Sequence, residues 1–543
     1  MTLLLLGGLL SALPPLGSGT GSVGSVPCLH DDAFPEVCVC NAQHCDTVAE
    51  LGSLSMNDLV YYQSSQGTSD RLARFEAPFD DASGEDGSIG WQIVVDPTET
   101  YQEILGFGGA LTDAAAINVH SLNKTVQKKF FESYYGDSGI RYTLGRVPMA
   151  SSDFSTHIYS YAEVVEDKEL KHFSIEVDLD NELTGAKLIF ILEALEAVRG
   201  RRGVHELLLF ASPWAPPAWM TVENRTLKNP HLRDDCREPW AAYFSKFLSA
   251  YATKGVDFWG VTAENEPRGN LGTWQALKFT PQTQMEFIRD YLGPQLRRDH
   301  PKVKIMMFDD QRAFLPEWVD VVLGGNNSAL EYVDGIGLHW YASLNDQITW
   351  LMKPFEKMKA AHERFPDKFL LPTEACAGYI FVFDKGPKPG LWSRAELYAF
   401  DIIHDLNAWA VGWTDWNIAL DMQGGPNWAQ NYVDAPILVD ASRQRFLKNP
   451  MFYALGHFSR FIVPGSRRIK VTSRSNSRLE EALDAAAFIT PDNFVVCVIL
   501  NRGSKARSVK FQQDARAKVL TVPAHSIQTI ITVAAKVPAH SIQ

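Results

Sequence analysis

The sequence contains no uninterrupted apolar segment of the ~18 residues that a membrane-spanning helix requires. It also contains no lysine or arginine before Arg71. A leucine-rich start over residues 3–10 is followed by small and turn-forming residues. This pattern resembles a secretory signal, except that the first segment carries only the amino terminus as positive charge. We therefore predict a signal peptide over residues 1–26 and a mature protein that is soluble and exported.

Acidic residues outnumber basic ones, with 64 Asp and Glu against 51 Lys and Arg. The formal net charge is −13 at pH 7, whereas nucleic-acid binding requires basic patches, so we predict no nucleic-acid partner. Full protonation of the 14 histidines would bring the sum close to neutrality. The lost negative charge would ease approach to an anionic membrane in an acidic compartment. The alternative interpretation is that these histidines are ordinary core and surface residues.

Cysteines are few, and four of the seven lie just after the predicted signal peptide, at Cys28, Cys38, Cys40 and Cys45. An exported chain favours disulfides over a zinc site, and four cysteines leave three pairings open. Glycosylation sequons begin at Asn123, Asn224 and Asn326. No histidine belongs to a cluster with metal-ligand spacing, so we predict neither a metal site nor a cofactor. The sequence does not determine the oligomeric state.

Eight strand-like apolar runs follow one another between residues 100 and 420, with helical patterns between them. Near-continuous apolar character is typical of parallel strands that are covered on both faces, and the alternation predicts a (β/α)8 barrel. The runs are residues 103–108, 142–149, 207–214, 258–263, 303–308, 333–340, 369–373 and 410–416.

The segments before and after the barrel contain short alternating runs that predict antiparallel strands. We expect both ends of the chain to form one accessory β-sandwich. Residues 522–528 recur as residues 537–543, and we expect the last residues to be a tail. The predicted units are a small antiparallel β subdomain (27–53 plus 418–449), the β-sandwich (54–100 plus 466–535), the barrel (101–417 plus 450–465) and the tail (536–543).

Two glutamates end two of the apolar runs, in the strings Asn265-Glu266-Pro267 and Thr373-Glu374-Ala375. In a barrel, the carboxyl ends of different strands meet on one face, where shared chemistry takes place. Cleavage of a glycosidic bond with retention needs one carboxylate as nucleophile and a second as acid and base. The alternative is a structural ion pair at the barrel rim. Glu264 would share a strand face with Glu266, and we interpret it as structural.

An ordered set of strings resembles the glucosylceramidases of glycoside hydrolase family 30, from about residue 28 to about residue 530. Each string alone is a weak signal, whereas the order of the set is specific. The strings begin at Gly106 (GFGGA), Arg146 (RVPMA), Ala211 (ASPW), Val261 (VTAENEP), Asp309 (DDQR), His339 (HWY), Thr373 (TEAC), Gly412 (GWTDWN) and Gly424 (GGPNW).

The resemblance implies a barrel, a β-sandwich and a small N-terminal sheet held by disulfides, with Cys28 paired to Cys38 and Cys40 paired to Cys45. It implies a retaining glycosidase that hydrolyses glucosylceramide at a lipid surface. It further implies residence in the lysosome, a saposin-type activator and a lysosomal membrane transport receptor. Secretion is the alternative location.

Roles follow from the resemblance position by position. Glu374 is the expected nucleophile and Glu266 the expected acid/base. Arg146 is expected to hold the carboxylates, and Tyr341 to donate a hydrogen bond to Glu374. Cys376 and His339 are interpreted as structural. The remaining expected substrate-binding residues are Asp153, Trp214, Asn265, Trp416 and Asn431; the plain alternatives are a helix cap, barrel core and turn residues.

The chain departs from the family pattern in several places. Ser152 and Ala276 stand where the family has cysteines, and residues 229–238 align poorly. These differences concern the aglycone side more than the chemistry. One alternative is therefore a family 30 enzyme acting on another β-glucoside or a β-glucan. A second alternative is an inactive glycolipid-binding or trafficking protein.

Overall fold

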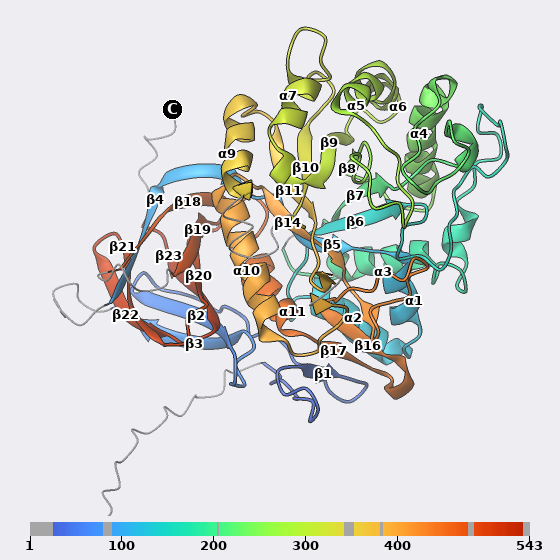
Figure 1. Ribbon diagram of the computed structural model, residues 1–543. Helices are drawn as coiled ribbons and strands as arrows, with labels where there is room; N and C mark the ends of the chain where they lie inside the picture. Colours follow the sequence, from blue (N-terminus) through green and yellow to red (C-terminus); the bar gives the residue numbers. More distant parts are fainter. Residues whose placement is uncertain are drawn as a thin grey trace, which may run out of the picture.

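The computed structural model describes residues 25–79, 90–203, 206–341, 352–380, 384–475 and 483–535. The predicted tail and all but the last two residues of the predicted signal peptide lie outside these ranges. The molecule has three parts, a β-sandwich, a barrel and a small sheet below the barrel (Figure 1). None of the described helices combines the length and the apolar character needed to cross a membrane.

Eight parallel strands form the barrel, in chain order, and each backbone pairs with the next. The ring closes between its last two members, where Val411 N donates to Leu370 O at 2.9 Å. The predicted barrel is thus confirmed. The strands are β5 (Gly106–Ala110), β6 (Leu144–Met149), β7 (Leu208–Pro213), β8 (Gly260–Thr262), β9 (Lys304–Gln311), β10 (Gly335–His339), β11 (Phe369–Glu374) and β14 (Gly412–Asn417).

Helices surround the barrel, and local sequence sets several of their first residues. Thr112 caps α1 by accepting a hydrogen bond from Ala115 N, and Thr280 and Thr283 form a capping box at α5. The helices are α1 (Asp113–His120), α2 (Lys124–Tyr135), α3 (Lys187–Arg199), α4 (Arg237–Thr253), α5 (Pro281–Phe287), α6 (Gly293–Asp299), α7 (Glu317–Leu323), α9 (Pro354–Arg364), α10 (Trp392–Asn407) and α11 (Pro450–Ser459).

Close strand packing explains one glycine of the barrel. A Cβ atom added at Gly108 would lie 1.9 Å from the carbonyl oxygen of Leu144 on the next strand. Only glycine permits this approach of β5 to β6. Inside the barrel, Leu144, Phe210, Met306 and Leu371 form a small apolar cluster, so the barrel is a packed core.

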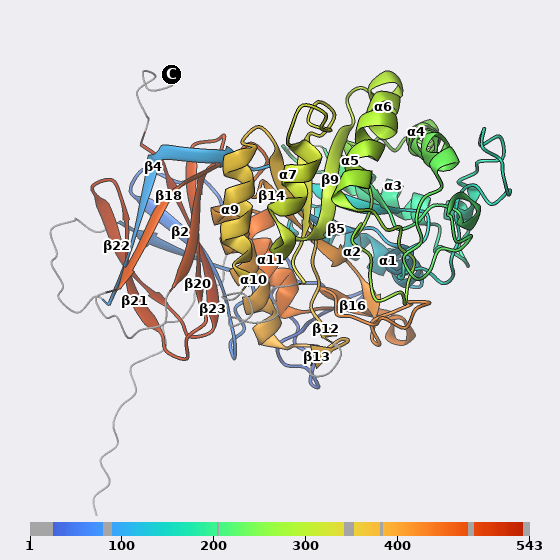
Figure 2. The same cartoon turned by 45° about the horizontal axis from the view of Figure 1, so that its top comes forward.

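Both ends of the chain build the sandwich, as predicted. α10 and α11 lie between this sandwich and the barrel (Figures 1 and 2). Apart from one parallel pair, β21 with β4, its neighbouring strands are antiparallel. The strands, in spatial order, are β22 (Arg516–Val522), β21 (Arg507–Gln513), β4 (Trp91–Glu103), β18 (Arg467–Ser475), β19 (Asp484–Ile489), β20 (Phe494–Asn501), β23 (Ser526–Val533), β2 (Asp58–Ser65) and β3 (Ala73–Pro78).

The small sheet has the order β1 (Cys38–Cys40), β17 (Arg445–Lys448), β16 (Ile437–Asp440) and β15 (Leu420–Asp421). It is mixed, because β15 and β16 are parallel. The small antiparallel subdomain expected from the sequence is therefore wrong for the pair β15 and β16, whereas β1–β17 and β16–β17 are antiparallel. Between β15 and β16 the chain passes the cavity, which Asn431 and Val433 line, and then starts β16 in the same direction as β15. A further short ribbon pairs β12 (Tyr379–Ile380) with β13 (Asp384–Lys385).

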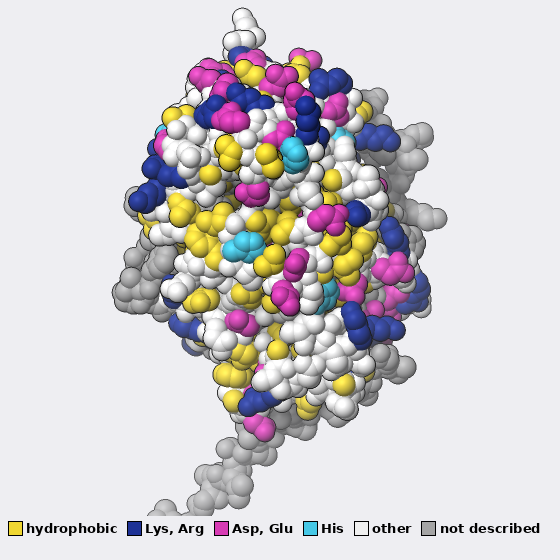
Figure 3. Space-filling view, turned by 90° about the vertical axis from the view of Figure 1, so that its right-hand side faces the viewer, with side chains coloured by type: hydrophobic (Ala, Val, Ile, Leu, Met, Phe, Trp, Pro, Cys, Tyr) yellow, Lys and Arg dark blue, Asp and Glu magenta, His cyan; other side chains and the backbone are white. Residues whose placement is uncertain are grey.

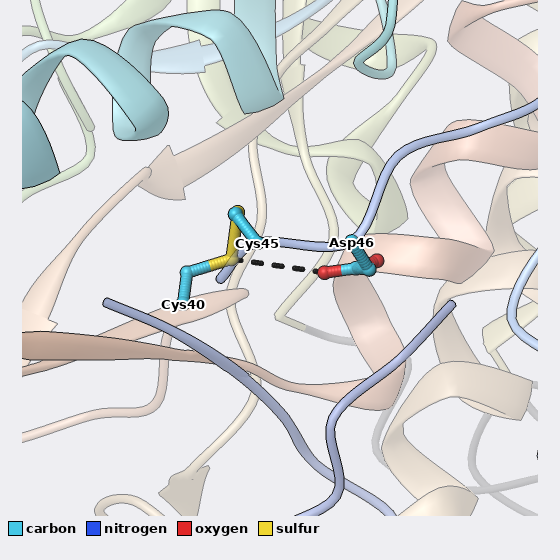
Figure 4. Close-up of side chains that lie close together, drawn as sticks. All are labelled: Cys40, Cys45 and Asp46. Carbon is cyan, nitrogen blue, oxygen red and sulfur yellow. Dashed lines mark hydrogen bonds between the residues drawn. A yellow bond between two sulfur atoms is a disulfide. The ribbon is translucent and has the colours of Figure 1, made fainter. Parts of the chain in front are cut away.

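Two disulfides hold the N-terminal segment, Cys28–Cys38 and Cys40–Cys45, which is the pairing that the family resemblance implies. Asp46 follows the second disulfide, with its Oδ1 atom 3.7 Å from the Cys40 sulfur (Figure 4). The Asp46 carboxylate also accepts hydrogen bonds from Lys448 and Tyr453. The segment is thereby fixed to β17 and α11.

Candidate active site

A cavity of about 170 Å³ opens at the carboxyl ends of the barrel strands. Every residue expected from the sequence to bind or transform a substrate lines it. Arg146 lies beneath, fully buried in β6. The lining residues are Asp153, Trp214, Asn265, Glu266, Trp274, Gln311, Tyr341, Glu374, Cys376, Tyr379, Trp416, Asn431 and Val433.

Glu374 ends β11, and neighbouring donors hold both of its oxygens. Arg146 donates to Oε2, and the Tyr341 hydroxyl donates to Oε1 at 2.8 Å. Burial disfavours the Arg146 cation, but the charges of Asp309 and Glu374 raise its pKa above the ordinary value. A permanent cation and a hydroxyl donor therefore fix the position of the Glu374 carboxyl group.

Glu266 lies in the loop after β8 and faces Glu374. Its backbone has a φ of 49°, a conformation that is uncommon for residues other than glycine. Gln311 Nε2 donates to Glu266 Oε1 at 3.0 Å, which fixes the carboxyl group. One carboxylate oxygen of Glu266, one of Glu374 and a ring nitrogen of His339 all lie within 4.8 Å of one another.

His339 occupies the space between the acidic groups. Its Nδ1 atom lies 3.3 Å from Glu266 Oε1 and 3.9 Å from Glu374 Oε1, and its Nε2 atom lies 3.2 Å from Asp309 Oδ1. Burial opposes the charged form, but the charge of Glu374 and the hydrogen bonds to Asp309 and Glu266 raise the pKa of His339 to about 10. The ring is therefore an imidazolium, and both nitrogens carry protons.

Asp309 supports this arrangement from β9. Its carboxylate accepts hydrogen bonds from Arg146, Ser212, Thr262 and Thr373 as well as from His339. Burial raises the pKa of Asp309, but the charge of Arg146 and these donors hold it well below the usual range. Glu266 and Glu374 approach the buried His339 from the cavity side, so Asp309, His339 and the two glutamates form one network of ionisable groups.

Asp153 follows β6 at another side of the cavity. Its Oδ2 atom accepts hydrogen bonds from Asn427 Nδ2 at 3.2 Å and Asn431 Nδ2 at 3.1 Å. Burial raises the pKa of Asp153 to about 7, although both amides oppose that shift. In mildly acidic solution this carboxyl is protonated and has both a donor and acceptors.

Two indoles form an apolar wall of the cavity. Trp214 follows β7 and Trp416 lies in β14, and their rings stack with centroids 5.0 Å apart. The Arg146 guanidinium lies 5.0 Å from the first ring centroid and 5.4 Å from the second. This cation–π stack orients both rings and ties the wall to Glu374 through Arg146.

Several lining residues were not predicted from the sequence: Trp274, Gln311, Tyr379 and Val433. Gln311 belongs to the string DDQR at the end of a strand, which is a signal that could have identified it. Trp274, Tyr379 and Val433 lie in loops and short strands, where no periodicity indicates which way a side chain points. Cys376 also lines the cavity, but burial raises the pKa of its thiol well above the usual value, which disfavours the reactive thiolate.

Glu264 does not share the position of Glu266. The strand β8 ends at Thr262, so the two-residue alternation does not continue to these glutamates. The Glu264 side chain is fully buried and does not line the cavity. Burial and the charge of Asp309 raise its pKa well above the usual value, so it is a neutral acid. Elsewhere, the sequon residues Asn123, Asn224 and Asn326 are all exposed.

Comparisons with known proteins agree with this geometry. Residues 104–462 match the glycosyl hydrolase family 30 TIM-barrel domain and residues 465–530 the family's β-sandwich domain. Putative glucosylceramidase 3 of Caenorhabditis elegans is 40% identical over 94% of this chain and 96% of its own. Lysosomal acid glucosylceramidase of Mus musculus is 38% identical over 91% of this chain and 93% of its own.

A solved structure shows the same architecture. The crystal structure of SrfJ from Salmonella typhimurium superposes with a TM-score of 0.77 and 26% identity. The alignment covers 87% of this chain and 99% of that one. The family matches, the relatives and the carboxylate-lined barrel mouth lead to one conclusion: the chain belongs to glycoside hydrolase family 30 and is a glycosidase.

Proposed function

We propose that the protein is a retaining β-glucosidase that hydrolyses glucosylceramide to glucose and ceramide. The observation that carries the proposal is the approach of one oxygen of Glu266 and one of Glu374 to within 4.8 Å in one cavity. Retaining enzymes place their two carboxyl groups about 5–5.5 Å apart, whereas inverting enzymes keep about 6.5–9.5 Å for a water molecule. The relatives named glucosylceramidase motivate the choice of lipid.

The reaction proceeds in two displacements. The Glu374 carboxylate attacks the anomeric carbon while the bond to the ceramide oxygen breaks, and that oxygen takes the proton of Glu266. Water then attacks the glycosyl-enzyme intermediate, the bond to Glu374 breaks, and Glu266 accepts the proton of the water. Two inversions at one carbon release glucose in its original β configuration.

The neighbours of Glu374 also prepare the sugar site. Asn265 Oδ1 accepts a hydrogen bond from Arg146 Nη2 at 2.9 Å, so the amide NH₂ group is the end that remains to donate to the 2-hydroxyl of the sugar. Contacts to that hydroxyl strengthen in the transition state. Asp153 and Asn431 provide acceptors and donors for outer hydroxyls, and Trp214 and Trp416 provide the apolar wall.

The lipid part of the proposal rests on the surface around the cavity. Exposed large apolar side chains occur in the loops that follow β6, β7 and β8, on the same end of the barrel as the carboxylates. They are Ile158, Val164, Val165, Leu183, Val222 and Leu271. Figure 3 shows hydrophobic side chains gathered across the middle of the face that lies at the right of Figure 1. The lysosome, the saposin-type activator and the transport receptor remain predictions from the resemblance.

The experiment compares glucosylceramide in anionic vesicles with a soluble aryl β-glucoside at pH 5. We expect both to be hydrolysed, with β-glucose as the first anomer seen by NMR. Glu374→Gln should reduce turnover of both substrates by several orders of magnitude. Glu264→Gln is the matched control, because Glu264 is a neutral acid outside the cavity and glutamine has the same shape.

The anomer of the first product and the range of substrates distinguish the alternatives. α-Glucose as the first product would refute the retaining mechanism. Hydrolysis of the aryl glucoside alone would refute the lipid assignment and favour another β-glucoside or a β-glucan. If the folded protein hydrolyses neither substrate, the alternative of a glycolipid-binding or trafficking protein becomes the better explanation.

A further inference from the structure

One asparagine side chain joins two loops of the barrel mouth. The first loop, residues 221–232, lies between β7 and α4, and the second, residues 267–278, lies between β8 and α5. Asn229 Nδ2 donates to Asn270 O at 2.9 Å, and Asn229 Oδ1 accepts from Asn270 N at 3.0 Å. The side chain therefore pairs with both backbone groups of one residue, as a neighbouring strand would.

Two backbone hydrogen bonds also join these loops, on the side of the second loop that leads to α5. Ala276 N donates to Thr226 O at 3.1 Å, and Lys278 N donates to Pro230 O at 2.8 Å. The second loop is consequently held along most of its length. Among the described residues, the hydrogen bonds of the Asn229 side chain are what joins the first loop to residue 270 of the second loop, apart from packing.

The Asn270 side chain in turn holds the backbone of the segment that contains Trp274. Its Oδ1 accepts from Gly272 N at 2.6 Å, and its Nδ2 donates to Trp274 O at 3.2 Å. Both bonds lie inside the second loop and close a tight turn. Trp274 is therefore fixed by its own backbone, and its side chain lines the cavity that contains Glu266 and Glu374.

The backbone on both sides of the pair of Asn229 and Asn270 adopts left-handed conformations. Lys228 and Asn229 have φ values of 60° and 52°, and Gly269 has a φ of 84°. A Cβ atom added at Gly269 would lie 2.8 Å from Asn229 Cγ. Left-handed conformations at a lysine persist only where the surrounding structure requires them, and such positions cluster at functional sites. Tight packing and backbone strain therefore occur at the same point.

The two loops lie on the side of the cavity from which the leaving group departs. In the proposed reaction Glu266 protonates the oxygen of the departing aglycone, and the second loop begins directly after Glu266. Within these two loops, Val222 and Leu271 are 65% and 79% exposed. Exposed aliphatic side chains suit a hydrocarbon aglycone, because they offer no hydrogen-bond partner to the hydroxyls of a second sugar.

We propose that Asn229 and Asn270 are positioning residues that hold Trp274 as the wall of the leaving-group subsite, which selects an apolar aglycone. This inference rests on the proposed function. The pair acts through Trp274 and does not touch the reacting atoms. Its removal changes how the enzyme discriminates between leaving groups.

The test compares two soluble substrates, octyl β-glucoside and β-glucosyl fluoride, whose leaving group is too small to reach Trp274. For Asn229→Ala and Trp274→Ala, we expect the ratio of kcat/KM for the octyl substrate to that for the fluoride to fall about tenfold, the scale of one large apolar contact. Asn229→Asp keeps only the acceptor and should give an intermediate ratio. Gly269→Ala displaces Asn229 sterically and should reproduce Asn229→Ala.

Asn407→Ala is the control, because Asn407 donates to Ala485 O at the sandwich interface and lies outside the loop pair. If Asn229→Ala lowers both rates equally, the pair is merely structural and the inference is wrong. An unchanged ratio for Trp274→Ala would also overturn it. A wild-type protein that cleaves neither substrate would refute the proposed function itself. If Asn229→Ala does not fold, Trp274→Ala still tests the proposal, because it leaves the hydrogen bonds between Asn229 and Asn270 intact.

Discussion

Replacing His339 by glutamine removes a positive charge from between the two glutamates of the cavity. The imidazolium lies 3.3 Å from Glu266 and 3.9 Å from Glu374. A pKa of about 10 keeps it charged throughout the range in which the enzyme would work. The variant therefore loses the attraction between this cation and the acidic groups around it.

The size of the effect follows from distance. Two unit charges about 4 Å apart interact by about 1 kcal/mol in water and about 4 kcal/mol at an effective dielectric constant of 20. Loss of the imidazolium should therefore lower the free energy of unfolding by about 1–4 kcal/mol for each charge pair that it forms.

The contribution of His339 to stability depends on pH in a definite direction. The folded-state pKa of His339 is raised to about 10, above its ordinary value, so its contribution is complete below about pH 6.5 and disappears as the pH rises through 10. The shift corresponds to roughly 5 kcal/mol for this fully buried ring. His339→Gln should therefore lose most stability at pH 5, and the difference from wild type should narrow in alkaline solution.

The assay is urea unfolding at pH 5 and pH 9, with hydrolysis of an aryl β-glucoside at pH 5 as a check of the active site. His404→Gln is the matched control, because His404 also pairs with a carboxylate, Asp484, but at the sandwich interface. An equal loss of stability at pH 5 and at pH 9 would show that His339 acts only by its shape. That result would refute the assignment of a charged imidazolium.

Two further predictions concern buried charges. Burial raises the pKa of Asp153 to about 7, above its unfolded value, so its contribution to stability is largest in acid and is lost as the pH rises towards 7. Asp153→Asn should remove about 2 kcal/mol of the decrease in unfolding free energy between pH 5 and pH 7; an unchanged pH dependence in urea denaturation would contradict this. Lys187 Nζ lies 3.0 Å from Asp113 Oδ1 and 3.3 Å from Asp178 Oδ1, and all three side chains are buried. Lys187→Met should lower stability by about 3–5 kcal/mol, because it leaves two buried carboxylates unpaired, and calorimetry that shows an unchanged Tm would contradict it.

Pattern alone identified the barrel because parallel strands covered on both faces leave long apolar runs. The same pattern placed Glu266 and Glu374 on one face, since both follow the carboxyl ends of strands. Periodicity was less accurate at strand ends: residues 258–263 read as one strand, whereas β8 contains only Gly260–Thr262. The loop that follows turns Glu264 into the core and Glu266 into the cavity.

The charge of His339 could not be predicted from the sequence. A single histidine at the end of a strand carries no signal of its own, and we interpreted it as structural. Its charge depends on Asp309 from β9, Glu266 from a loop and Glu374 from β11. Similarly, nothing in the string around Asn229 indicates that its side chain pairs with Asn270 in another loop.

The sequence by itself determined the order of the eight strands, the sandwich built from both chain ends, the cluster of four cysteines and the two glutamates. These features depend on local periodicity and spacing, which a chain carries wherever it folds. Only the tertiary structure decided the charge of His339, the proton on Asp153 and the position of Trp274. Those properties depend on burial and on neighbours from distant segments, because closure of the barrel is what brings them into contact.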